Sequence, residues 1–335
     1  MKVGIPRGLF YFYHYPLWKT FFRDLGVEVE VSSDTNRTIL DNGIQLALDE
    51  TCLPVKVYYG HVWQLCNRQV DYIFLPRIVS VEPKSYICPK FMGVPDMVKA
   101  AFPNLPPVID CLVDVSRGYR SLESEIIRIG KIFGRRTRQI KEAYRHGLEE
   151  LYFCQTLAAD GYTLNEAIKV WEGHRVEIGN ARQLNLGVLG HGYSLYDDTV
   201  SMNIIKRLRE MGCRICLPES IPIHNIEAAA ATLPKRIFWT LGRKMVGSAL
   251  CMDRHSEIHG IIYVACFGCG PDSMVGEIIE RKIKNKAFML ITIDEHTGEG
   301  GLITRLEAFC DMLLRRRLRS SVNNLSSHGE CPYTN

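Results

Sequence analysis

The chain has 335 residues, of which 46% are hydrophobic and 23% charged, and its formal net charge at pH 7 is +4. This length predicts about two domains, and the composition is that of a globular protein with a sizeable core rather than a disordered chain. The small net charge does not indicate a nucleic-acid-binding protein, and no run of about 18 apolar residues is available to span a membrane.

The first part of the chain, residues 1–115, alternates between strand and helix patterns. Short apolar segments predict strands over residues 2–6, 27–31, 71–75 and 108–113. Helical patterns occupy residues 15–25, 38–48 and 54–65. Strands that alternate with helices predict a doubly wound parallel sheet, so this part is predicted to be an N-terminal α/β domain.

The pattern changes over residues 116–182. Leu122, Ile126, Ile129 and Phe133 recur at helical spacing, and a similar stripe continues from Ile140. With no strand pattern interrupting it, this region is predicted to be a helical linker or small helical subdomain.

A second α/β pattern occupies residues 183–319, and a polar tail is expected over 320–335. Strands are predicted over residues 185–189, 213–217, 261–265 and 288–293. Helices are predicted over residues 200–211, 237–251, 273–284 and 302–318. The sequence therefore predicts two doubly wound parallel-sheet domains joined by a helical segment.

Twelve cysteines are present, and the N-terminus begins directly in a predicted strand, without the pattern of a signal peptide. We therefore expect a cytoplasmic protein, in which thiols stay reduced and a surplus of cysteine indicates metal or redox chemistry.

Three of these cysteines stand beside a proline, in Cys52-Leu-Pro, Cys88-Pro and Cys269-Gly-Pro. Proline favours the first turn of a helix, and a helix N-terminus offers free N–H groups and positive partial charge to a thiolate or its ligand. We predict that Cys52, Cys88 and Cys269 bind one iron–sulfur cluster, assembled by folding because the closely spaced run of a ferredoxin is absent. Three ligands on a four-iron cluster leave one iron open, and the oxygen sensitivity of such a site indicates an anaerobic setting. The alternative is that each cysteine is a small buried hydrophobic residue.

Other cysteines offer weaker signals. Cys266 precedes Cys269 by three residues and is an alternate or additional ligand candidate, although it ends an apolar strand pattern. Cys213 and Cys216 form a CxxC pair inside a predicted strand, so core packing is favoured over a redox or zinc role.

A dense group of titratable residues, Asp294, Glu295, His296 and Glu299, follows the predicted strand 288–293. Glu295 and His296 are the candidate catalytic residues, because they could move protons or hydrogen-bond a ligand at the open iron. Helix capping and an interdomain hydrogen-bond network are the structural alternative. Arg7, Arg77, Lys90 and Lys56 could balance an anionic cluster or form ion pairs, and His191 could be a site or turn residue.

Four stretches of this chain carry a family resemblance: ETCLPVKVYYGH at 50–61, YICPKFMGVPDM at 86–97, FGCGPDS at 267–273 and IDEHTGE at 293–299. The chain resembles the acyl-CoA dehydratase activase-related family, which is akin to the cluster-bearing subunits of 2-hydroxyacyl-CoA dehydratases and to double-cubane cluster proteins. The resemblance implies two flavodoxin-like domains with an iron–sulfur cluster between them. It also implies a partner, an ATP-hydrolysing reductase of the actin-like fold with its own iron–sulfur cluster, that injects low-potential electrons.

The sequence itself contains no GxxxxGK[ST] loop, so ATP chemistry would have to come from such a partner. The favoured reading is an iron–sulfur protein, with a 4Fe–4S cluster favoured and a double cubane allowed, that reduces or dehydrates a small substrate. Two alternatives stay open: an electron-transfer or regulatory subunit without its own substrate, and a metal-free binding module. A homodimer or a related second subunit is compatible with the three-cysteine pattern, and neither nucleic acid nor a membrane is expected as a partner.

Overall fold

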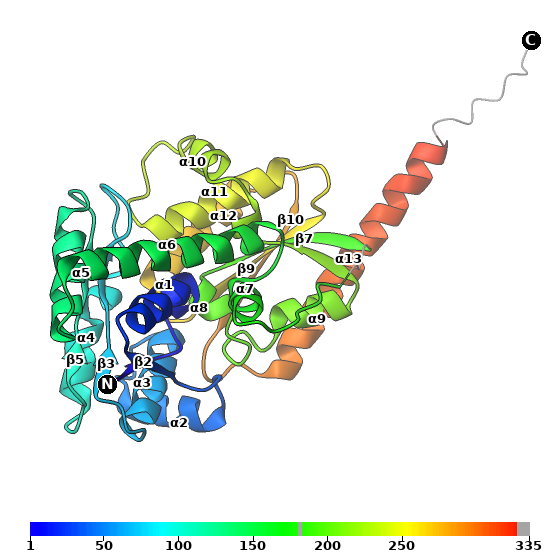
Figure 1. Cartoon of the computed structure of the whole chain (residues 1–335). Helices are drawn as coiled ribbons and strands as arrows, with labels where there is room; N and C mark the ends of the chain where they lie inside the picture. The colour runs from blue at the N-terminus through cyan, green and yellow to red at the C-terminus, as the bar shows by residue number, and fades with distance from the viewer. Residues whose placement is uncertain (180–182, 327–335) are drawn as a thin grey trace, which may run out of the picture.

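The computed structural model describes residues 1–179 and 183–326, and it is an α/β protein with parallel sheets flanked by helices (Figure 1). The N-terminal half contains a 4-stranded parallel sheet in the order β2-β1-β3-β5. Its strands are β1 (Lys2–Ile5), β2 (Glu28–Val31), β3 (Tyr72–Phe74) and β5 (Val108–Ile109). Beyond β3 and β5, the chain continues into β4 (Arg77–Ser80) and β6 (Leu112–Asp114), which pair in parallel with each other as a separate sheet. Pro76, which has no N–H to donate, lies at the break between β3 and β4.

The C-terminal half contains a second 4-stranded parallel sheet in the order β10-β9-β7-β8. Its strands are β7 (Leu184–Gly190), β8 (Cys213–Cys216), β9 (Gly260–Cys266) and β10 (Ala287–Ile293). When only the strands of each 4-stranded sheet are numbered along the chain, both sheets have the spatial order 2-1-3-4, which is how a flavodoxin-like sheet begins. In such sheets ligands bind beyond the carboxyl ends of the strands, next to the first and third strands.

Helices cover both sheets. In the N-terminal half and the segment that follows it they are α1 (Tyr11–Asp24), α2 (Arg37–Leu46), α3 (Leu53–Cys66), α4 (Pro89–Ala101), α5 (Arg120–Ile132), α6 (Thr137–Ala159) and α7 (Leu164–Trp171). In the C-terminal half they are α8 (Gly192–Leu195), α9 (Ile204–Glu210), the 3-10 helix η1 (Pro218–Ser220), α10 (Ile223–Ala230), α11 (Thr240–Arg254), α12 (Gly270–Lys282) and α13 (Glu299–Ser326). None of the described helices is both long enough and apolar enough to cross a membrane.

The predicted helical segment exists, and it packs against the N-terminal half rather than only connecting two domains. Helix α6 lies along α1 so closely that a Cβ atom added to Gly147 would stand 2.6 Å from the backbone oxygen of Leu17. Figure 1 shows α6 extending from α5 toward the C-terminal half, and Arg209 of α9 pairs there with Glu166 of α7. The segment therefore contacts both halves.

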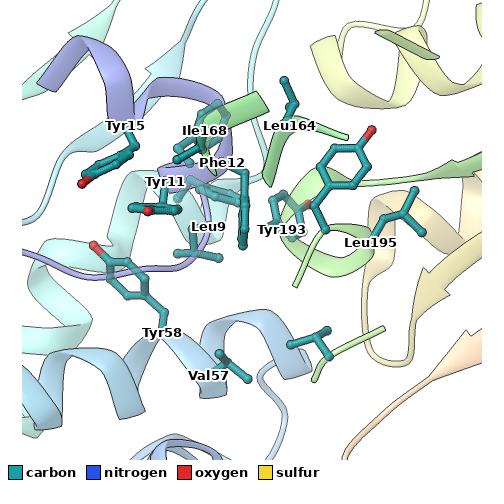
Figure 2. Close-up of a cluster of buried hydrophobic side chains, with 14 of the residues drawn as sticks. Leu9, Tyr11, Phe12, Tyr15, Val57, Tyr58, Leu164, Ile168, Tyr193 and Leu195 are labelled. Carbon is teal, nitrogen blue, oxygen red and sulfur yellow. The ribbon is translucent and has the colours of Figure 1, made fainter. Parts of the chain in front are cut away.

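One hydrophobic cluster extends across the two halves, and part of it is drawn in Figure 2. The residues labelled there are Leu9, Tyr11, Phe12, Tyr15, Val57, Tyr58, Leu164, Ile168, Tyr193 and Leu195. They come from the N-terminal half, the helical segment and the β7–α8 region of the C-terminal half, so the sheets are held together by continuous apolar packing. A second cluster, which includes Leu189, Met245 and Tyr263, lies within the C-terminal half.

Several helix boundaries differ from the sequence prediction. Helix α1 begins at Tyr11 rather than residue 15, α9 begins at Ile204 rather than residue 200, and α11 begins at Thr240 rather than residue 237. Helix α12 begins at Gly270, not residue 273, because Pro271 occupies one of its first two positions, where its fixed φ is favourable. Helix α13 runs to Ser326, past the expected start of the tail at residue 320. The rest of that tail, residues 327–335, and residues 180–182 of the predicted helical segment lie outside the described residues.

Candidate functional site

The three proline-associated cysteines each cap a helix. Cys52, Cys88 and Cys269 are the N-cap residues of α3, α4 and α12, and each helix has proline in its first two positions. The helix starts that the sequence predicted after these cysteines are therefore present. Each thiol lies at the positive end of a helix dipole.

Side-chain contacts bring these helix N-termini together. In the first turn of α4, after Cys88, the Phe91 ring packs on the Tyr193 ring with centroids 5.3 Å apart. Tyr193 in turn packs on His191 at 5.1 Å, and the Nε2 atom of His191 lies 2.7 Å from an Oδ atom of Asp272, in the first turn after Cys269. On the Cys52 side, the Lys90 ammonium donates to the backbone oxygen of Glu50 at 3.2 Å. The cysteine-bearing turns therefore meet where the two halves face each other.

Burial dominates the acidity of the three thiols. It raises the pKa of Cys52, Cys88 and Cys269, and the carboxylate of Asp272 raises all three further. The Lys90 ammonium opposes this shift at Cys52 and Cys88. A backbone N–H group in the first turn of each helix also opposes it, from Val55 at Cys52, Lys90 at Cys88 and Asp272 at Cys269. A raised pKa favours the protonated thiols, so a metal that bound here would have to displace their protons.

Cys266 lies beside this group, at the end of β9. It is buried, and its Sγ is 3.1 Å from the hydroxyl oxygen of Ser194. Its pKa is raised by burial first, and Cys52 adds to that shift. Cys266 is thus a neighbour of the three helix-capping cysteines.

The three thiols are the donor type that iron–sulfur clusters use. Within residues 1–179 and 183–326, no group of three or more His, Cys, Asp or Glu side chains is arranged around one metal-ion position. The ligands of an iron–sulfur cluster bind different iron atoms and lie farther apart than the ligands of one ion. Three thiols on converging helix N-termini fit a cluster of this kind.

Glu295 and His296 lie in the loop between β10 and α13. The Glu295 carboxylate forms an ion pair with the ammonium of Lys56, one helical turn after Cys52, and both side chains are largely buried. Burial would raise the pKa of Glu295, but the Lys56 hydrogen bond and charge hold it below its usual value. His296 is exposed, and its backbone N–H donates to Asp294 at 3.0 Å. The geometry resembles the interdomain network that was the structural alternative for this loop.

The other basic candidates are engaged in local contacts. Arg7 pairs with Asp34 at 2.6 Å, and Arg77 pairs with both Asp96 and Asp110.

Asp272, Tyr263 and Tyr193 were not identified from the sequence, whereas His191 was considered only as a turn or site residue. The one local signal for Asp272 is its position three residues after Cys269. Its contacts with Tyr263 and His191 join β9, α12 and the turn after β7, and such long-range pairs leave no spacing pattern in a single sequence.

Comparison with known families adds one match. Residues 2–221 match the model of the CoA enzyme activase uncharacterised domain (DUF2229). The chain belongs to this family. The match supports the resemblance to the activase-related family noted in the sequence. The matched region of this DUF2229 protein contains Cys52 and Cys88 and ends before Cys269. No curated protein matches the chain.

Proposed function

We propose that this DUF2229 protein is a 2-hydroxyacyl-CoA dehydratase-like iron–sulfur protein that binds a 4Fe–4S cluster through Cys52, Cys88 and Cys269. The observation that carries the proposal is the convergence of three cysteine-capped helix N-termini between the two halves. When bound, the cluster would supply one-electron transfer and an open iron position for reduction or dehydration of a small substrate.

The chain's own residues prepare the site for a polyanionic group. The N-termini of α3, α4 and α12 present positive partial charge, and Lys90 adds a full charge near Cys52 and Cys88. Phe91 and Tyr193 pack ring to ring beside the Cys88 turn and contribute apolar surface next to the thiols. The Lys56–Glu295 pair ties the first turns of α3 to the β10–α13 loop and so holds the two sides of the site together.

A partner would supply the electrons. The sequence has no phosphate-binding loop of the GxxxxGK[ST] type, and the family name refers to an activase. Both support a separate ATP-hydrolysing reductase of the actin-like fold, with its own iron–sulfur cluster, as the donor. We propose that both proteins act in the cytoplasm of an anaerobic cell. We also propose that this chain forms a homodimer or assembles with a related subunit.

A second candidate function is an electron relay without its own substrate. It is favoured by the ion pair of Glu295 with Lys56, because the ammonium stabilises the ionised carboxylate and makes it a weaker base. Adding a candidate acyl-CoA to the reduced protein separates the two functions. An enzyme would show a changed electron paramagnetic resonance (EPR) spectrum of the cluster, and a relay would not.

The test of the proposal is the iron and sulfide content and the EPR spectrum of protein purified without oxygen. We expect about four irons per chain in the wild type and loss of the cluster in Cys52→Ser, Cys88→Ser and Cys269→Ser. Cys66→Ser is the matched control, because Cys66 ends the same helix that Cys52 caps and lies about 20 Å from it. About eight irons would indicate a double cubane and bring Cys266 back into consideration. No iron after reconstitution, or zinc in its place, would refute the proposal.

A further inference from the structure

A buried carboxylate lies beside the proposed cluster ligands. The side chain of Asp272 is 3% exposed, and one of its oxygens accepts a hydrogen bond from the Tyr263 hydroxyl at 2.7 Å. The same oxygen lies 2.7 Å from the Nε2 atom of His191. An ionised carboxylate has no proton to donate and can only accept hydrogen bonds. Both neighbours therefore act as donors, and they fix the position of the carboxylate.

Helix capping does not explain this residue. Asp272 is the third residue of α12, a position from which an acidic side chain often reaches back to the N-cap backbone. Here the carboxylate instead contacts Tyr263 of the central strand β9 and His191 of the turn after β7. Both contacts point into the interior of the C-terminal half rather than along α12.

Asp272 lies close to the cysteine-bearing turns. It lies one helical turn after Cys269, and its contacts with His191 and thereby Tyr193 connect it to Phe91, one turn after Cys88. It is therefore a buried carboxylate within one helical turn of a proposed ligand. A fixed charge acts strongly in such a buried region, because little water screens it.

We propose that Asp272, held in place by Tyr263 and His191, lowers the reduction potential of the cluster bound by Cys52, Cys88 and Cys269. A negative charge beside the cluster disfavours the addition of an electron, and net charge and hydrogen bonding are among the factors that set such potentials. Asp272 is therefore a residue that tunes the site, not a catalytic residue. The inference rests on the proposed cluster and adds the reason why a low-potential donor would be needed.

The test is a mediated redox titration of the anaerobic, iron-loaded protein, followed by EPR. Asp272→Asn keeps the shape of the side chain and removes its charge, so we expect the midpoint potential to rise. Tyr263→Phe keeps the carboxylate but removes the positive end of a hydroxyl dipole, so we expect a smaller shift in the opposite direction.

The matched control is Asp253→Asn. Asp253 is also a buried carboxylate of the C-terminal half, and it accepts backbone N–H groups from residues 284–286, just before β10 begins. Because β10 has 7 residues, this carboxylate lies about 20 Å from the strand ends where the cysteines meet. We expect no change of midpoint potential in this variant.

The outcomes separate this inference from the proposed function. If the wild type binds no iron, both are refuted. If iron is bound and Asp272→Asn has the wild-type midpoint potential, the tuning role is refuted and the cluster is not. If Asp272→Asn does not fold or loses its iron, Tyr263→Phe decides, and an unchanged midpoint in that variant overturns the inference.

Discussion

The two halves of this protein share the strand order 2-1-3-4 but differ in strand length and in the residues of their cores. In the N-terminal sheet the strands have 4, 4, 3 and 2 residues, whereas three of the four C-terminal strands have 7 residues. The N-terminal core is rich in aromatic contacts, in which Trp18 and Phe22 of α1 pack on Phe74 and Phe21 packs on Trp18. The central C-terminal strand β9, with the sequence GIIYVAC, is instead buried along its whole length. The same topology thus tolerates two kinds of core.

The halves also divide the proposed site. Cys52 and Cys88 come from the N-terminal half, whereas Cys269 and Asp272 come from the C-terminal half. A parallel sheet places loop residues at the carboxyl ends of its strands whatever fills its core, so two unlike sheets can present complementary parts of one site. The following variants test how far the halves differ in stability and how closely each is coupled to the site.

The largest effect is expected in the aromatic core. Phe22 is fully buried, and its ring packs on Phe74 and Phe133 at centroid distances of 5.2 Å and 6.0 Å. Phe22→Ala should lower the free energy of unfolding by about 3–5 kcal/mol, because it removes ring contacts and leaves a cavity. Urea denaturation would measure this, with Ile262→Ala in β9, expected to cost about 2–5 kcal/mol, as the C-terminal counterpart. A loss below 1 kcal/mol for Phe22→Ala would contradict an aromatic N-terminal core.

The ion pair between the halves comes next. Lys56→Met keeps the length of the side chain but leaves the largely buried Glu295 carboxylate unpaired, which should cost about 3 kcal/mol. The double variant Lys56→Met/Glu295→Gln should recover part of this loss. Arg37→Met is the control, because Arg37 and Asp41 form an exposed pair that contributes about 0.5 kcal/mol or less. Equal unfolding free energies for the two single variants would show that the interdomain pair contributes no more than a surface pair.

Two glycines at close helix contacts, one in each half, allow an effect on stability to be distinguished from an effect on iron binding. A Cβ atom on Gly60 of α3 would stand 1.9 Å from the backbone oxygen of Ile39, and one on Gly247 of α11 would stand 2.3 Å from that of Ile226. Each change to Ala should cost about 1–3 kcal/mol in thermal or urea unfolding, because a backbone must move. Since Cys52 caps α3, only Gly60→Ala should also reduce the iron content. Equal iron content in both variants would show that the position of α3 does not control the site.

The smallest effect is a pH dependence that originates in the N-terminal half. Burial first, and then the charge of Arg7, lower the pKa of His61 from 6.5 to about 3. Between these values the unfolded chain binds a proton that the folded protein does not, so stability falls as the pH drops. His61 should contribute a loss of about 1.4 kcal/mol per pH unit in this window. Urea denaturation at pH 5.5 and pH 4.5 would measure this. The free energy of unfolding should fall less between these pH values in His61→Gln than in the wild type, by about the amount given for His61. Identical slopes in the two proteins would contradict a neutral buried His61.

Local features of the fold could be read from the sequence, because they depend on neighbouring residues. The alternation of apolar strand segments with helical patterns predicted the α/β class, and the helix starts at Cys52, Cys88 and Cys269 followed from proline chemistry within three residues. The helical segment after residue 116 was predicted from the spacing of its apolar residues, from Leu122 to Phe133.

Only the tertiary structure decided which distant residues meet. The strand order, the Lys56–Glu295 pair and the contact of His191 with Asp272 each join segments far apart in the chain. Parallel strands pair only after a crossover connection, so no local pattern specifies their neighbours. The two sheets and the hydrophobic cluster that extends across both halves set the relative position of the three cysteine-bearing turns, and the buried carboxylate beside those turns became visible only through that packing.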